Sequence, residues 1–214
     1  TYLEALSSPD APFWKEAINS EFESIIENNT WILTNLPPGN KPLGCKWLFK
    51  KKMRTDGTIE KYKARLVVQG FGQKGGIDFF DTYSPVAHIS TIRVILALAS
   101  IYKLYVHQMD VKTAFLHGDL DEEIYMHQPE GFSMPGQENK VCRLVKSLYG
   151  LKQAPRAWYD RLSKFLLENN FERGNVDKTL FIKKKNNDLL VVQIYVDDII
   201  FGATNETLCQ DFAK

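Results

Sequence analysis

The sequence contains little cysteine and almost no net charge. Its 214 residues include three cysteines, and no two of them have the spacing of a metal site: Cys45, Cys142 and Cys209. An odd number of thiols without such spacing predicts reduced cysteines in an intracellular protein. The net charge is +1, so the total charge alone does not indicate a nucleic-acid partner.

Long apolar runs are absent as well. No stretch approaches the roughly 18 apolar residues of a membrane-spanning helix, and no segment resembles a signal peptide, so we expect no membrane partner. The sequence has no internal repeat and no low-complexity linker. It opens at Thr1 without a methionine, so we expect a piece of a longer protein. This length predicts one domain, or two small lobes around a shared core.

Charge is nevertheless unevenly distributed along the chain. Cations gather between positions 50 and 65, and carboxylates gather between positions 119 and 123. The cations fall on two predicted strands, 46–53 and 58–68, which the Asp56-Gly57 turn joins into a hairpin. A basic patch on a near-neutral protein is typical of nucleic-acid contact. An ordinary solvated ribbon, with lysines that prevent edge-to-edge aggregation, explains the same pattern.

Apolar spacing predicts helices and strands in mixed order. Helices are expected from Ser8 or Asp10 to Asn28, after a cap at Ser90, and after Pro155, where the last would bury Trp158, Leu162, Phe165 and Leu166. Further strands are expected at 105–111, 124–127, 141–145, 180–184, 189–196 and 199–202, with a turn at Asn186-Asn187-Asp188. Because the order is neither alternating βα nor all-β, we predict an α+β fold with antiparallel hairpins.

Two adjacent aspartates, Asp197 and Asp198, stand between apolar strands near the end of the chain. Taken alone, this segment is explained by an exposed turn with two solvated carboxylates. Another predicted strand ends in Asp110, whose simplest role is a helix cap. If the two strands are neighbours, the three carboxylates would repel one another unless cations bridge them. Two hard cations about 3.5–4 Å apart would neutralise the negative charge of these carboxylates and suit phosphoryl transfer.

Several short motifs then follow one another in the order found in one family. They are Lys46-Trp47-Leu48-Phe49-Lys50, Tyr62-Lys63-Ala64-Arg65-Leu66-Val67, Phe80-Asp81-Thr82-Tyr83-Ser84-Pro85-Val86, Asp110-Val111-Lys112-Thr113-Ala114-Phe115-Leu116-His117-Gly118, Ser147-Leu148-Tyr149-Gly150-Leu151-Lys152-Gln153-Ala154-Pro155-Arg156 and Tyr195-Val196-Asp197-Asp198. Through these motifs the chain resembles the reverse transcriptases of copia-type retrotransposons over essentially its whole length. The resemblance implies the fingers and palm of a right-hand polymerase, with the thumb absent.

The resemblance also implies an RNA-dependent DNA polymerase with two Mg²⁺ ions, or Mn²⁺ as an alternative. Asp110 and Asp197 would be metal ligands, Asp198 would be the third catalytic carboxylate, and the backbone carbonyl of Val111 would complete the set. The fingers would occupy roughly residues 1–100 with the hairpin 46–68, and the palm roughly 101–214 with an inserted fingers-like segment near 120–155.

Cationic residues for the incoming dNTP are implied by the same resemblance. Arg65 best matches the triphosphate-binding arginine of the family. Lys51 matches the accompanying lysine if the runs of lysine are superposed, although Lys50, Lys52 or Lys63 could serve instead. A triphosphate requires such cations in addition to Mg²⁺.

Further residues of the implied nucleotide site are aromatic or lie before the third helix. Phe115 would lie under the sugar and exclude a 2′-hydroxyl by its bulk, whereas a simple core position is the alternative. Tyr149, Gly150 and Lys152 would contact template or nucleotide, whereas a helix entry at Pro155 explains the same segment. Retroviral enzymes carry glutamine at the position of Tyr149.

The implied partners are an RNA or DNA template with its primer, dNTPs, and the rest of a Pol polyprotein that includes a ribonuclease H domain. A cytoplasmic virus-like particle is the implied location. The alternative function is a non-catalytic nucleic-acid-binding or assembly module derived from a retrotransposon. A dinucleotide site at Gly70–Gly75 is rejected, because its fingerprint needs a helix immediately afterwards.

Overall fold

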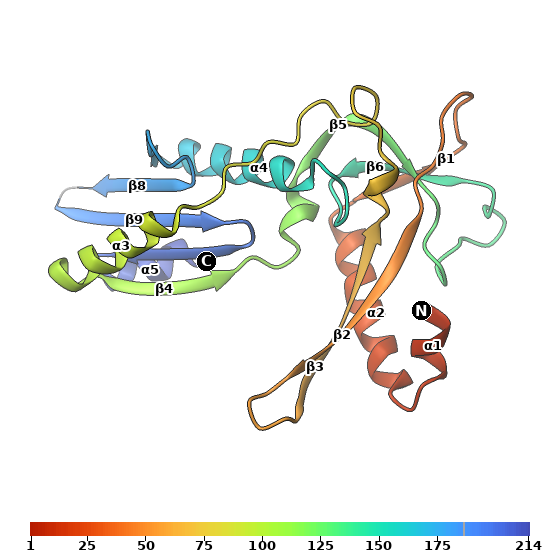
Figure 1. Cartoon of the computed structure of the whole chain (residues 1–214), viewed down its shortest axis with the longest axis horizontal. Coiled ribbons are helices and arrows are strands. Elements are labelled where there is room, and N and C mark those ends of the chain that lie inside the picture. The colour runs from red at the N-terminus through yellow and green to blue at the C-terminus, as the bar shows by residue number, and fades with distance from the viewer. Residues whose placement is uncertain (186) are drawn as a thin grey trace. The chain divides into compact units, whose positions relative to one another are not determined.

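The chain divides into two compact units, each built from two separate stretches of sequence. The computed structural model describes residues 1–185 and 187–214 (Figure 1). Unit 1 comprises Thr1–Thr82 and Phe115–Ala157, and unit 2 comprises Tyr83–Ala114 and Trp158–Lys214. Each unit has a hydrophobic core of its own.

Unit 1 combines two helices, a long hairpin and a small antiparallel sheet. The helices are α1 (Tyr2–Ser7) and α2 (Ala11–Glu27), and the hairpin consists of β2 (Cys45–Met53) and β3 (Ile59–Val68). The sheet has the order β1-β6-β5, with β1 (Trp31–Thr34), β6 (Val141–Lys146) and β5 (Asp119–Met126). Two short 3₁₀ helices are η1 (Gly70–Gly72) and η2 (Ala114–His117), the second of which crosses the border between the units.

The packing of unit 1 follows from two periodicities in the sequence. Trp14, Ile18 and Ile25 recur at helical spacing and are buried along one side of α2. Alternate residues of β3, such as Ala64 and Leu66, are buried on one face of the hairpin. The two apolar surfaces form one core, so the opposite face of the hairpin is exposed and carries mainly polar side chains together with Leu48.

Unit 2 is a five-stranded antiparallel sheet with helices packed against it (Figure 1). The strand order is β4 (Tyr105–Asp110), β10 (Asp198–Ala203), β9 (Asp188–Tyr195), β8 (Leu180–Lys185) and β7 (Glu172–Arg173). The helices are α3 (Ile89–Tyr102), α4 (Ala154–Glu168), which begins at the end of unit 1, and α5 (Glu206–Phe212). One face of the sheet packs against α4 and α5 through Leu166, Phe181, Phe201 and Cys209.

The expected α+β class is confirmed, and most expected elements are present. Two details were wrong. Helix α3 begins at Ile89 after His88, so Ser90 is not its cap, and Phe165 of α4 is 52% exposed rather than buried. The short elements α1, β1, β7 and α5 were not predicted. The expected turn at Asn186-Asn187-Asp188 includes Asn186, which lies outside the described residues. No helix within residues 1–185 or 187–214 is both long and apolar enough to cross a membrane.

Candidate active site

Strand pairing in unit 2 brings the predicted metal ligands to one end of the sheet. In the antiparallel register of β10 with β4, Asp198 lies directly opposite Asp110. In the register of β10 with β9, Asp198 lies opposite Tyr195, so Val196 and Asp197 form the hairpin loop. The backbone N–H of Val111 donates to the carbonyl of Asp197 at 2.9 Å. Two pairs of adjacent residues, Asp110–Val111 and Asp197–Asp198, are therefore neighbours through their backbones although they are distant from each other in sequence.

The hairpin loop has an unusual backbone conformation. Val196 has a φ of +57°, a region that β-branched residues rarely occupy. Its carbonyl accepts a hydrogen bond of 2.8 Å from the indole N–H of Trp158 on α4. Two successive carbonyls of the loop, those of Val196 and Asp197, are thus each held by a donor from another element.

The chemistry of this donor set fits hard divalent cations. Carboxylate and carbonyl oxygens are the ligands that Mg²⁺ prefers, and two like charges directly opposite each other on neighbouring strands are unfavourable without a counter-charge. As the side chains stand, no group of three His, Cys, Asp or Glu residues within 1–185 and 187–214 is arranged to hold a metal ion. The Asp198 carboxylate instead accepts a hydrogen bond of 3.2 Å from Gln108 Nε2.

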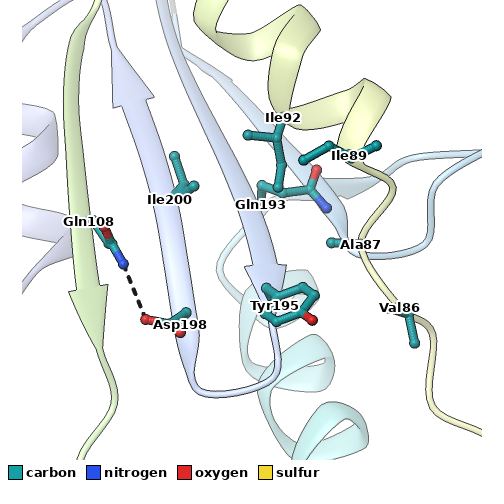
Figure 2. A pocket seen from close by; sticks show the side chains of 9 residues that line it. All are labelled: Val86, Ala87, Ile89, Ile92, Gln108, Gln193, Tyr195, Asp198 and Ile200. Atoms are coloured by element: carbon teal, nitrogen blue, oxygen red, sulfur yellow. Dashed lines mark hydrogen bonds between the residues drawn. The ribbon is translucent and has the colours of Figure 1, made fainter.

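A pocket of about 490 Å³ opens beside Asp198 within unit 2. Figure 2 shows Gln193 reaching from β9 toward Ile89 and Ile92 of α3, with Asp198 and Gln108 on the far side of the pocket. Gln193 is only 1% exposed, and its Oε1 is the buried side-chain atom without a hydrogen-bond partner among the described residues. The pocket therefore has mainly apolar walls with polar groups near the hairpin.

A buried carboxylate that was not predicted from the sequence contacts Gln193 of this pocket. Asp177 is 6% exposed and accepts hydrogen bonds from Thr91 Oγ1 at 2.6 Å and from Thr179 N at 2.9 Å. It also accepts longer bonds of 3.4 Å from His88 N and Gln193 Nε2. Burial raises the pKa of Asp177, but the hydrogen bonds from Thr179 and Thr91 outweigh it and leave the pKa below its usual value. Asp177 thus ties the start of α3 to the segment before β8.

The basic residues of unit 1 lie on one face of the β2–β3 hairpin. The register sets Leu48 opposite Arg65, Lys50 opposite Lys63 and Lys52 opposite Lys61. Since strand residues alternate between faces, these six side chains share the face that α2 does not cover. Two pairs of lysines directly opposite each other are electrostatically unfavourable. We call this surface, defined by Lys50, Lys52, Lys61, Lys63 and Arg65, the basic face.

Lys51 lies on the opposite face of the hairpin. Its Nζ is 2.5 Å from Asp10 Oδ2 and 5.4 Å from the centre of the Tyr62 ring. The Tyr62 ring in turn packs edge-on against Trp14 of α2 at 4.6 Å. A hydrogen bond to Asp10 raises the pKa of the Lys51 ammonium. Lys51 therefore fastens the hairpin to the start of α2, whereas the other candidate lysines share the face of Arg65.

Three predicted nucleotide contacts do meet within unit 1. The guanidinium carbon of Arg65 lies 4.1 Å from the centre of the Tyr149 ring. The Tyr149 ring lies 4.5 Å from that of Phe115, with the planes inclined by 54°. Phe115 is partly buried beside the core rather than within it. Tyr149 thus separates the candidate triphosphate cation from the candidate sugar contact.

Glycines allow the Tyr149 segment to approach β3 closely. The carbonyl of Tyr149 accepts a hydrogen bond of 2.7 Å from Val68 N. Gly150 has a φ of +98°, and a Cβ there would come within 2.0 Å of the Val68 carbonyl oxygen. A Cβ at Gly70 would come within 1.9 Å of the Gly150 carbonyl oxygen. Gly70 therefore serves close packing, and the 3₁₀ turn at Gly70–Gly72 replaces the helix that a dinucleotide site needs.

Lys152 is held by neighbours in unit 1. Its Nζ donates to the carbonyl of Gln73 at 3.2 Å and lies 4.7 Å from the centre of the Phe79 ring. The buried side chains of Gln73 and Gln153 are hydrogen-bonded at 2.9 Å. These contacts tie the segment before α4 to the loop after β3.

The described cysteines are unpaired. Cys45, Cys142 and Cys209 are all free thiols. Burial raises the pKa of Cys45 to about 11 and, with the influence of Cys45, that of Cys142 to about 12. Both thiols therefore stay protonated near neutral pH, which suits a structural rather than a nucleophilic role.

Comparison with known proteins assigns the chain to a family. A family model described as reverse transcriptase (RNA-dependent DNA polymerase) matches residues 28–214. The chain belongs to this family. It is 48% identical over 206 residues, 96% of the chain, to the Retrovirus-related Pol polyprotein from transposon TNT 1-94 of Nicotiana tabacum. It is 42% identical over 196 residues, 91% of the chain, to that from transposon RE1 of Arabidopsis thaliana.

These relatives confirm the resemblance to copia-type reverse transcriptases. The chain covers 16% of the length of the first relative and 13% of the second, so it corresponds to a small part of each polyprotein. Within this reverse transcriptase domain, strand pairing places the predicted carboxylates in unit 2, and the Arg65, Tyr149 and Phe115 side chains meet in unit 1. The sequence reasoning missed Asp177 and the polar role of Trp158, because it treated Trp158 only as an apolar helix residue.

Proposed function

We propose that the chain is the polymerising part of a copia-type reverse transcriptase, an RNA-dependent DNA polymerase that adds dNTPs to a primer 3′-hydroxyl. The observation that supports this most is the register of the β9–β10 hairpin with β4. It sets Asp198 opposite Asp110 and ties the Asp197 carbonyl to Val111. Carboxylates gathered at the end of one sheet are the arrangement that phosphoryl transfer with two metals requires.

In this proposal the end of the hairpin holds the metal ions. Asp110 and Asp197 are the principal carboxylate ligands, Asp198 is the third carboxylate, and the Val111 carbonyl supplies a neutral oxygen. Bound Mg²⁺ at such a site activates the attacking hydroxyl and neutralises charge on the phosphates. In this proposal Gln108 orients the Asp198 carboxylate through its hydrogen bond to one carboxylate oxygen, Oδ1.

The basic face binds the triphosphate in this proposal. Arg65 is the planar, bidentate group suited to phosphate oxygens. Lys50 and Lys63 lie opposite each other next to the Leu48–Arg65 pair, so both share the face of the candidate triphosphate-binding arginine. We assign the accompanying cation to Lys50 and Lys63 rather than to Lys51, because Lys51 faces Asp10 on the other side of the hairpin.

Phe115 and Tyr149 recognise the sugar and the base in this proposal. An aromatic ring under the ribose leaves no room for a 2′-hydroxyl, which selects dNTPs by shape. Contact with template and primer is expected mainly through phosphates and duplex shape rather than base sequence. The template, the primer and the remaining Pol polyprotein are proposed partners, and a cytoplasmic virus-like particle is the proposed location.

The test is extension of a labelled primer on an RNA template by the purified chain at low salt, with and without Mg²⁺. Incorporation of dNTPs that requires Mg²⁺ is the expected result. Binding of the primer–template without any extension, in this chain and in a longer Pol segment, would overturn the proposal. That outcome would instead favour the non-catalytic nucleic-acid-binding module.

A further inference from the structure

The loop between β9 and β10 is strained where it carries the proposed metal ligands. A two-residue hairpin loop with positive φ at its first central residue favours glycine there, because a Cβ is crowded in that conformation. This chain has Val196 at that position, with a φ of +57°. A β-branched side chain in this region persists only when surrounding contacts enforce it.

Trp158 supplies one of the contacts that enforce this conformation. Its side chain is buried, with 5% exposure, and a buried indole N–H needs an acceptor. The acceptor is the carbonyl of Val196 at 2.8 Å. The next carbonyl along the chain, that of Asp197, accepts from Val111 N. The loop is therefore held at the Val196 carbonyl by α4 and at the Asp197 carbonyl by the segment that follows Asp110.

We infer that Trp158 is a positioning residue for the hairpin that carries Asp197 and Asp198. Its N–H⋯O bond keeps Val196 in the left-handed conformation and thereby fixes the direction of the two aspartates relative to Asp110. The expected effect of Trp158 on catalysis rests on the proposed function. Its expected effect on the conformation of the loop does not depend on activity. Trp158 touches no reacting group, and it acts through the backbone of Val196.

The first test is amide hydrogen exchange, which needs no activity. Trp158→Phe removes the N–H and keeps an aromatic ring, and Trp47→Phe is the matched control. Trp47 is equally buried, at 6% exposure, and its indole N–H donates to the Glu130 carbonyl at 3.1 Å in unit 1. In Trp158→Phe we expect exchange at the Val111 amide to become about tenfold faster or more, as for local opening of a turn. In Trp47→Phe the Val111 amide should exchange at the wild-type rate, and equal rates in both variants would overturn the inference.

The second test uses primer extension with the same pair of variants. Trp158→Phe should lower kcat about 10- to 100-fold with little change in the KM for dNTP, because a small displacement of a catalytic group has that effect. Even if Trp47→Phe lowers the melting temperature as much as Trp158→Phe does, it should not lower kcat to the same extent. If neither the wild-type chain nor a longer Pol segment extends a primer, the proposed function fails. If primers are extended and both variants lose kcat alike, this inference fails instead.

Relief of the strain provides a rescue that a purely structural role for Trp158 would not produce. Glycine adopts positive φ without penalty, so in a Val196→Gly background the loop no longer depends on the indole N–H. Trp158→Phe should then cost several-fold less in kcat than it costs with Val196 present. If Trp158→Phe does not fold, Val196→Gly alone decides: an unchanged or higher melting temperature supports a strained turn, and a lower one contradicts it.

Discussion

At the scale of the residue, the proposed metal site can be tested by changing one carboxylate at a time. Asp110→Asn and Asp197→Asn each remove one negative charge from the proposed metal site and change the side-chain volume very little. We expect primer extension to fall by at least about 10²-fold, since electrostatic stabilisation is usually the largest catalytic contribution. Asp198→Asn should also be severe but less so. Melting temperature serves as the control, and near wild-type extension by a folded Asp110→Asn variant would contradict the metal assignment.

Phe115 is the residue at which selection between sugars can be tested. Phe115→Val leaves space for a 2′-oxygen, so we expect use of ribonucleotides to rise while use of dNTPs is retained. The measurement is the ratio of kcat/KM for a dNTP to that for the matching ribonucleotide. An unchanged ratio would show that Phe115 is only a packing residue beside Tyr149.

At the scale of the element, the β2–β3 hairpin places neighbouring lysines on opposite faces. Lys50 shares the basic face with Arg65, whereas Lys51 contacts Asp10 and Tyr62. We expect Lys50→Gln to raise the KM for dNTP about tenfold, as for loss of a hydrogen bond to a charged group, without lowering the melting temperature. Lys51→Gln should lower the melting temperature and leave the KM nearly unchanged. The reverse pattern would return the triphosphate contact to Lys51.

Asp177 makes the stability of the fold around α3 in unit 2 depend on pH. Its pKa is lower in the folded protein than in the unfolded chain, so its ionised form stabilises the fold above the ordinary aspartate pKa of about 3.9. That contribution is lost as the pH falls through the lowered pKa. Asp177→Asn should therefore be less stable than the wild type at pH 6, and the difference should shrink below about pH 4. Melting curves from pH 3 to 7 measure it, and a difference independent of pH would contradict this role.

At the scale of the whole molecule, the extent of the chain governs how nucleic acid is held. The chain covers 16% and 13% of the length of the two relatives, and we propose that a longer segment of such a polyprotein adds contacts to the nucleic-acid duplex. Fewer phosphate contacts mean fewer released counterions, hence weaker binding and a shallower salt dependence. We expect these 214 residues to extend primers poorly and with low processivity. A longer Pol segment should bind a primer–template more tightly with a steeper salt dependence, and equal processivity of the two would contradict the argument.

The sequence predicted those features that depend on local pattern or on recognisable motifs. The periodicity of α2 and the Asp56-Gly57 turn specify their own structure, and the carboxylate motifs mark strand ends. Contacts between distant segments could not be predicted in this way. The role of Asp177 depends on which segments lie nearby. Strand alternation predicts the face of Lys51, but its contact with Asp10 depends on where α2 begins. The strain at Val196 is likewise invisible in a motif, because it arises from tertiary hydrogen bonds.

The contact between Gly70 and Gly150 limits how this domain can vary in sequence. Each glycine faces backbone atoms of the other segment at distances that exclude any Cβ, so no compensating change elsewhere in the side chains can make room. Gly39 and Gly57 also have positive φ, but a Cβ there would meet nothing within 4 Å. In a library of folded variants, asparagine should therefore recur at these two loop positions. Positions 70 and 150 should both stay glycine in every folded variant, because each lies too close to the backbone of the other segment to carry a Cβ.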